Sequence, residues 1–63
     1  MKNLVFEYRK KNNFTQEYVA RTIDISLSQI RNIEQNRTSD PGVSIALKLA
    51  KLFNVSVEDL FFL

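Results

Sequence analysis

The sequence of 63 residues has room for one folded domain, and its 44% hydrophobic and 25% charged residues are typical of a globular chain rather than a disordered one. It contains no cysteine and no histidine, which excludes disulfides and thiolate metal sites and removes the commonest general base of enzymes. No apolar run approaches the roughly 20 residues that cross a bilayer, so we expect a cytoplasmic protein that has no membrane partner. We also expect no metal, no cofactor and no small-molecule ligand.

The formal net charge of +2 is too small to indicate a nucleic-acid partner by itself, but its distribution is uneven. All nine lysines and arginines lie between Lys2 and Lys51, whereas the last nine residues carry only Glu58 and Asp59 as charged side chains. Basic charge on the body and acidic charge at the tail fit a protein with one DNA-facing side, and they fit any other basic soluble domain as well.

Two short helices are predicted in the first third of the chain. Leu4, Val5 and Tyr8 follow helical spacing, which predicts a first helix of eight or nine residues that ends near the pair 12–13, where an asparagine can adopt the left-handed conformation. Thr15 is a good N-cap for a second helix that ends at 23–24. Its expected apolar stripe is Tyr18, Val19, Thr22 and Ile23.

A third helix follows after a sharp turn. Ser26 and Gln29 have the spacing of a capping box, and Ile30 and Ile33 are the expected buried positions. The outward positions are Leu27, Ser28, Gln29, Arg31 and Asn32. This face is polar, and it contains no acidic residue.

The turn itself has the composition of a helix-turn-helix. Asp24 tolerates the left-handed conformation, Ile25 supplies a buried apolar side chain and Ser26 caps the following helix. The sequence therefore predicts a helix-turn-helix over about residues 15–35.

The remaining chain predicts two further helices. After a turn-prone loop at 36–42, a fourth helix begins, Asn54 ends it, and a capping signature at 56–59 starts a fifth helix that runs into 60–63. The expected apolar face of the fourth helix is Val43, Ala46, Leu47, Leu49, Ala50 and Phe53. With no convincing strand, the fold class is all-α: one five-helix domain over residues 1–63.

Several motifs fall in register with one known family. They occupy residues 15–20, 23–26, 30–36, Pro41, 47–51 and 54–61. In this order and spacing they resemble the Cro/lambda-repressor family of XRE-type helix-turn-helix regulators over nearly the whole chain. Where the family usually has glycine, this chain has Asp24, Asn36 and Asn54, which are the residue types that adopt positive φ most readily after glycine.

The resemblance implies a five-helix, lambda-repressor-like DNA-binding bundle and a role for each matching position. Contacts to base edges fall to Leu27, Ser28, Gln29 and Asn32. Contacts to DNA phosphates fall to Gln16, Arg31, Arg37 and Thr38. Arg9 and Glu34 match a pair that forms a partly buried salt bridge between the first and third helices in several relatives. Each polar position has a simpler alternative as a solvated side chain, and Leu27 has one as a core residue.

The C-terminal segment carries a separate signal. Leu60, Phe61, Phe62 and Leu63 are more apolar surface than a domain of this size readily buries, and exposed apolar patches mark interfaces. Small stand-alone members of the family dimerise at this end of the bundle, so these four residues are the predicted dimer interface. The alternative is that one phenylalanine, most readily Phe61, enters the core of the single chain.

Three classes of function are open to a chain with this sequence. The first is a transcriptional regulator, expected to be a repressor, that binds an inverted-repeat operator in double-stranded DNA as a homodimer. The second is an antitoxin-like or adaptor module for protein interaction, which should have lost its phosphate contacts or gained acids on the recognition face. An antitoxin that also binds its own operator fits both of these classes. The third, an enzyme, has only carboxylates such as Glu34 and Glu58 to offer, and we see no catalytic site.

Overall fold

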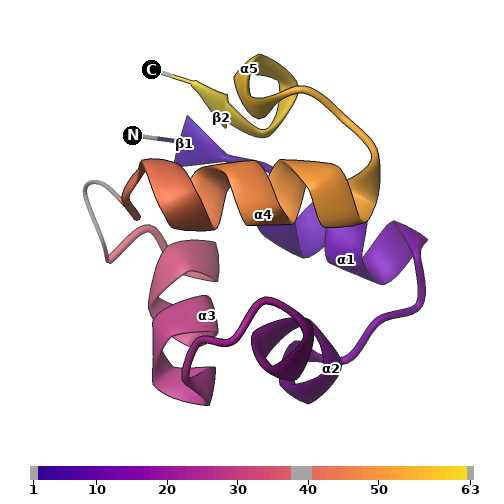
Figure 1. The fold of residues 1–63 in the computed structure, drawn as a ribbon, viewed down its shortest axis with the longest axis vertical. Helices are drawn as coiled ribbons and strands as arrows, with labels where there is room; N and C mark the ends of the chain where they lie inside the picture. The colour runs from indigo at the N-terminus through magenta and orange to yellow at the C-terminus, as the bar shows by residue number, and fades with distance from the viewer. Residues whose placement is uncertain (1, 38–40, 63) are drawn as a thin grey trace.

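The computed structural model describes residues 2–37 and 41–62. The elements in chain order are β1 (Lys2–Asn3), α1 (Val5–Lys11), α2 (Gln16–Thr22), α3 (Leu27–Glu34), α4 (Val43–Phe53), α5 (Val57–Leu60) and β2 (Phe61–Phe62). In Figure 1, α2 and α3 form the lower part of the molecule, α4 crosses the middle in front of α1, and α5 lies at the top beside the two strands. None of the helices in the described ranges has the length and apolarity to span a bilayer.

Four helix ends are set by asparagine or aspartate in the left-handed conformation. The φ angle is 58° at Asn13, 60° at Asp24, 57° at Asn36 and 59° at Asn54. Positive φ destabilises asparagine and aspartate less than other residues with side chains, because their short polar groups can hydrogen-bond locally. The predicted helix stops are therefore confirmed, including the three positions where the family usually has glycine.

Hydroxyl caps set the starts of α2, α3 and α5. The Thr15 hydroxyl accepts from the Tyr18 amide at 3.0 Å, and the Ser56 hydroxyl accepts from the Asp59 amide at 3.0 Å. Ser26 and Gln29 form the predicted capping box, with hydrogen bonds of 3.1 Å and 2.8 Å in the two directions. Each cap satisfies a backbone donor that the first helical turn would otherwise leave unpaired.

The core lies between the helices, and every helix contributes to it. Its buried apolar residues are Val5, Val19, Ala20, Ile23, Ile30, Ile33, Ala46, Leu49, Ala50, Phe53, Leu60 and Phe61. Four expected core positions are wrong: Tyr18, Thr22, Val43 and Leu47 are exposed. The buried face of α2 and that of α4 are therefore narrower than predicted, because other helices cover each of them on one side only.

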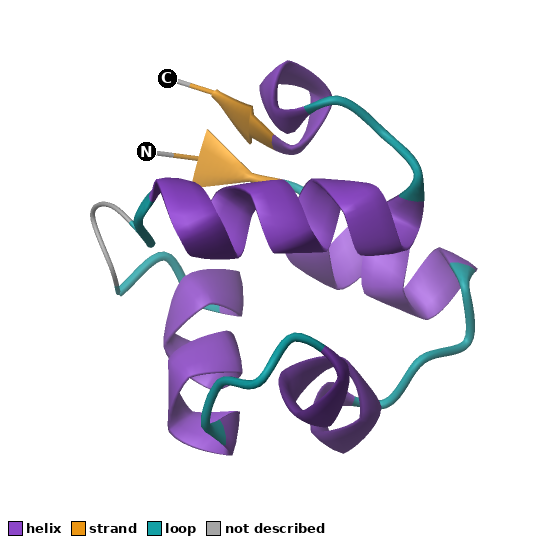
Figure 2. Ribbon diagram, viewed as in Figure 1, coloured by secondary structure: helices purple, strands orange, loops and turns teal. Residues whose placement is uncertain are grey.

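The C-terminal tail differs from the prediction of a helix. Phe61 and Phe62 form β2, which pairs antiparallel with β1 so that Lys2 lies opposite Phe62 and Asn3 opposite Phe61 (Figure 2). One further backbone hydrogen bond extends this pairing, since the amide of Leu4 donates to the Leu60 carbonyl at 2.9 Å. Local sequence could not indicate this pairing, which joins the two ends of the chain.

The strand also changes which tail residues are exposed. Leu60 is fully buried and Phe61 is 9% exposed, whereas Phe62 is 39% exposed. The prediction of Leu60 as an interface residue is therefore wrong, because its side chain is buried in the core of the single chain. The stated alternative that Phe61 enters the core is confirmed. Leu63, also predicted at the interface, lies outside the described residues.

Candidate nucleic-acid interface

The turn between α2 and α3 has the geometry that its sequence predicts. Asp24 adopts positive φ, and the Ile25 amide donates to the Ala20 carbonyl at 2.9 Å, which closes the end of α2. The Ile25 side chain is half-buried against the core, and Ser26 then caps α3. Because Ala20 is small and 4% exposed, α3 can pack closely across α2.

The two faces of α3 differ in burial. Ile30 and Ile33 are buried at 0% and 3% exposure and attach the helix to the core. Ser28, Gln29 and Arg31 are exposed on the other side, so these predicted contact residues are accessible to a partner. Leu27 and Asn32 are half-buried, and Leu27 packs against the core.

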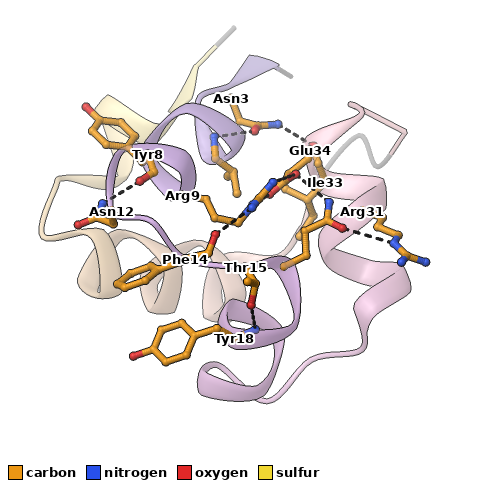
Figure 3. A network of polar contacts seen from close by, with 12 residues as sticks. Asn3, Tyr8, Arg9, Asn12, Phe14, Thr15, Tyr18, Arg31, Ile33 and Glu34 are labelled. Carbon is orange, nitrogen blue, oxygen red and sulfur yellow. Dashed lines mark hydrogen bonds and ion pairs between the residues drawn. The ribbon is translucent and has the colours of Figure 1, made fainter.

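The buried ion pair between Arg9 and Glu34 is confirmed. Nε of Arg9 donates to Oε2 of Glu34 at 2.6 Å and Nη2 donates to Oε1 at 3.2 Å, while Nη1 donates to the Phe14 carbonyl at 2.9 Å (Figure 3). The side chains are only 9% and 5% exposed. The bidentate geometry and the third hydrogen bond satisfy both charged groups inside the fold.

This pair leaves the exposed face of α3 positively charged. Glu34 is the only acid in α3, and its charge is balanced by Arg9 in the interior. Arg31 is then the one charged side chain on the outer face of this helix, and Figure 3 shows its guanidinium group at the outer edge of the polar network. A cationic surface of this kind is suited to an anionic partner.

Gln16 connects the ion pair to Arg31. Its amide nitrogen donates to Oε1 of Glu34 at 3.0 Å, and its amide oxygen accepts from Nε of Arg31 at 3.5 Å. Glu34 therefore fixes which way the amide of Gln16 faces. Because an amide group carries two N–H bonds, Gln16 keeps a second donor at the start of α2.

The segment after α3 carries the last predicted contacts. Asn36 adopts positive φ, and the amide of the next residue, Arg37, donates to the Asn32 carbonyl at 2.9 Å. The Arg37 side chain is exposed. Thr38 lies outside the described residues.

Sequence reasoning missed Asn3, which contacts the far end of α3. Its Nδ2 donates to the Ile33 carbonyl at 2.9 Å and to Oδ1 of Asn36 at 3.0 Å, and its Oδ1 accepts from the Val5 amide at 3.0 Å. An asparagine just before a helix is a sequence signal for the last of these bonds. No local signal could have found the other two, whose partners lie 30 or more residues away.

No group of three or more acidic side chains lies in an arrangement that could hold a metal ion within residues 2–37 and 41–62. The residues that the structure brings together are instead the polar face of α3, the start of α2 and the segment after α3. Together with the turn between them, these features define a helix-turn-helix domain.

Comparison with known proteins supports this class. A helix-turn-helix family model matches residues 5–60. The chain therefore belongs to the XRE-type helix-turn-helix family of DNA-binding transcriptional regulators.

Relatives cover almost the whole chain. An uncharacterized HTH-type transcriptional regulator of Methanocaldococcus jannaschii is 41% identical over 61 residues, which are 97% of this chain and 91% of that protein. YgzD, an uncharacterized HTH-type transcriptional regulator of Bacillus subtilis, is 33% identical over 63 residues, which are 100% of this chain and 94% of that protein.

One solved structure shares the fold. The N-terminal DNA-binding domain of SinR from Bacillus subtilis superposes with a TM-score of 0.78 at 24% identity, covering 84% of this chain and 77% of that one. The arrangement of helices around the turn is thus the same in the two proteins.

Proposed function

We propose that this protein binds an inverted-repeat operator as a homodimer and represses transcription from it. The observation that carries the proposal is the exposed face of α3, which is polar, cationic and free of unpaired acid, while Ile30 and Ile33 hold its other face in the core. A helix presented in this way fits the major groove, where base edges offer hydrogen-bond donors and acceptors. Repression follows from a bound dimer that blocks polymerase.

Base contacts are assigned to the outer face of α3. Ser28 and Gln29 are exposed and can hydrogen-bond base edges, and Asn32 can pair with N6 and N7 of adenine through its amide. Leu27 can contact a thymine methyl with the part of its side chain that the core leaves uncovered.

Phosphate contacts are assigned to groups around α3. Gln16 has a spare amide hydrogen, and Arg31 and Arg37 are exposed cations. Thr38, which follows Arg37, is proposed with them from the family pattern alone. Such contacts give affinity that falls steeply with salt, because they release counterions from the DNA.

The dimer is proposed to form at the end of the molecule opposite the turn. Phe62 is exposed there, and an apolar groove is bordered by Val43 and Leu47 of α4, by Val57 and by Phe61, the residue before Phe62. A second copy that covers this surface would bury apolar area now in water. Two α3 helices about 34 Å apart could then enter successive major grooves.

The test is a fluorescence titration of the DNA upstream of the protein's own gene and of a scrambled duplex, at two salt concentrations. We expect tighter binding to the upstream DNA, and a loss of about tenfold for Asn32→Ala there, in line with the ~1–3 kcal/mol of a bidentate amide–adenine pair. Equal binding to the two duplexes, unchanged by Asn32→Ala, would contradict the proposal.

An adaptor or antitoxin that no longer bound DNA is a weaker candidate. Such a protein has no reason to keep its recognition face free of acids, yet the exposed positions of α3 carry none. Arg31 and Arg37 also remain exposed, which favours an anionic partner.

A further inference from the structure

Asn3 joins three parts of the fold through one side chain. Figure 3 shows it between the start of α1 and the end of α3, with hydrogen bonds on both sides. Toward α1 its carbonyl oxygen accepts from the Val5 amide at 3.0 Å. Toward α3 its amide nitrogen donates to the Ile33 carbonyl at 2.9 Å and to the Asn36 side chain at 3.0 Å.

The partners of Asn3 lie where α3 ends. The Ile33 carbonyl belongs to the last helical turn, whose carbonyls have no partner within a regular α-helix. It accepts from the Asn36 amide at 3.1 Å and also from Asn3. Asn36 is the left-handed residue that directs the chain out of α3, and the exposed Arg37 follows it. Asn3 thus hydrogen-bonds both to the last turn of α3 and to Asn36, the residue at which the chain leaves the helix.

The backbone of Asn3 is fixed independently of α3. Asn3 lies opposite Phe61 in the pair of strands, and the next residue, Leu4, donates to the Leu60 carbonyl at 2.9 Å. The side chain therefore ties α3 to the paired chain ends. The hydrogen bonds of Asn3 to the Ile33 carbonyl and to the Val5 amide are partly buried, so they compete less with water than they would on the open surface.

We propose that Asn3 is a positioning residue for DNA recognition, which sets the orientation of α3 and of Arg37 relative to the paired strands at the chain ends. The proposal rests on the proposed function. If two copies associate next to Phe62, the same tie carries the geometry of the dimer interface to the reading helix. The proposal has a specific consequence. Loss of the hydrogen bonds from Asn3 to Ile33 and Asn36 lowers discrimination between operator and other DNA more than it lowers binding to DNA in general.

The substitution Asn3→Asp keeps the hydrogen bond toward α1 and removes those toward α3. Aspartate keeps an oxygen for the Val5 amide, so the hydrogen bond to the first residue of α1 stays. It has no N–H to donate to Ile33 or Asn36. Asn3→Ala removes all three hydrogen bonds. Ser56→Ala is the matched control, because it removes a helix cap at α5 whose hydrogen bond, from the Asp59 amide to the Ser56 hydroxyl, stays within that helix start.

The measurement is the ratio of affinities for upstream and scrambled DNA, taken well below each variant's melting temperature. The added negative charge of aspartate weakens binding to upstream and to scrambled DNA alike, so its effect cancels in the ratio. We expect Asn3→Asp and Asn3→Ala to lower the ratio by about tenfold, within the range of mutations that act through packed networks. Ser56→Ala should leave the ratio within about twofold of the native protein, as expected for a change that acts on stability at a separate site.

A second readout does not depend on DNA. Amide hydrogen exchange of Asn36 and Arg37 should quicken in Asn3→Asp, while exchange in the middle of α4 stays as in the native protein. Unchanged exchange at these two amides, or an equal loss of discrimination in Ser56→Ala, overturns the positioning role. If the native protein itself fails to discriminate while exchange responds as expected, the proposed function fails and the structural tie remains.

Discussion

Arg9 and Glu34 hold three helices together through one buried charge pair. Arg9 comes from α1 and Glu34 from α3, and Gln16 at the start of α2 donates to the same carboxylate. Hydrophobic spacing alone would give α1 one more apolar residue at this position. The charged pair instead adds directional hydrogen bonds between α1, α2 and α3, and it pairs the one acidic side chain of α3 in the interior.

Breaking this pair on one side should destabilise the fold strongly. Arg9→Met leaves the Glu34 carboxylate buried without its cation, for which a cost of about 3–5 kcal/mol in the free energy of unfolding is expected. Urea denaturation measures this free energy. In a domain this small, a loss of that size is most of the stability.

Two further variants decide whether the charge is the cause. Arg9→Met combined with Glu34→Leu should recover most of the loss, because no unpaired charge remains. Arg21→Met, at an exposed arginine of α2, should change the free energy by less than about 0.5 kcal/mol. A double variant as unstable as Arg9→Met would contradict this explanation.

At the scale of the elements, the helix boundaries follow from short local signals. Thr15, Ser26 and Ser56 mark helix starts in the sequence, and Asp24 and Asn54 mark helix ends, each as predicted. These signals act over three or four residues, so the sequence alone contains them. The burial of each helix depends on its neighbours, which is why Val43 and Leu47 were predicted in the core and are exposed.

Asn54 should show the cost of a side chain at positive φ. It ends α4 with φ 59° and ψ 46°. Asn54→Ala should lower the free energy of unfolding by about 1 kcal/mol, and Asn54→Gly should leave it equal or slightly higher, because glycine adopts this conformation without strain. The matched control is Gln35→Ala, at an exposed helix end with φ −91°. Thermal unfolding measures all three, and an equal effect of Asn54→Ala and Gln35→Ala would contradict the argument.

At the scale of the whole molecule, α2 and α3 lie on one side and the paired chain ends on the other (Figure 1). This separation lets the proposed recognition face and the proposed dimer surface work without overlap. The strands contribute to it directly, since β2 places Phe61 in the core and leaves Phe62 exposed. Among the tail residues that the structure describes, only Phe62 is thus exposed, whereas the sequence predicts a helix with apolar residues free for an interface.

The dimer proposal predicts that stability depends on concentration. A homodimer that forms through Phe62 melts at a higher temperature when more concentrated, because association favours the folded state. Phe62→Glu places a charge in the interface and should give a monomer in sedimentation. Tyr18→Glu puts the same charge at an exposed aromatic of α2, far along the chain from the tail, and should leave the association unchanged. A native protein that sediments as a monomer at all concentrations would rule the interface out.

The sequence by itself determined the five helices, their caps, the turn and the Arg9–Glu34 pair implied by the family resemblance. Caps and left-handed residues act locally, and a pattern that runs along the whole chain is specific to one family. Only the tertiary structure decided that Phe61 and Phe62 form a strand and that Asn3 reaches the end of α3. Both depend on the two ends of the chain meeting, and such contacts form between residues whose proximity no local pattern records. The helix-turn-helix can therefore be predicted from sequence, whereas the hydrogen bonds of Asn3 to the end of α3 cannot.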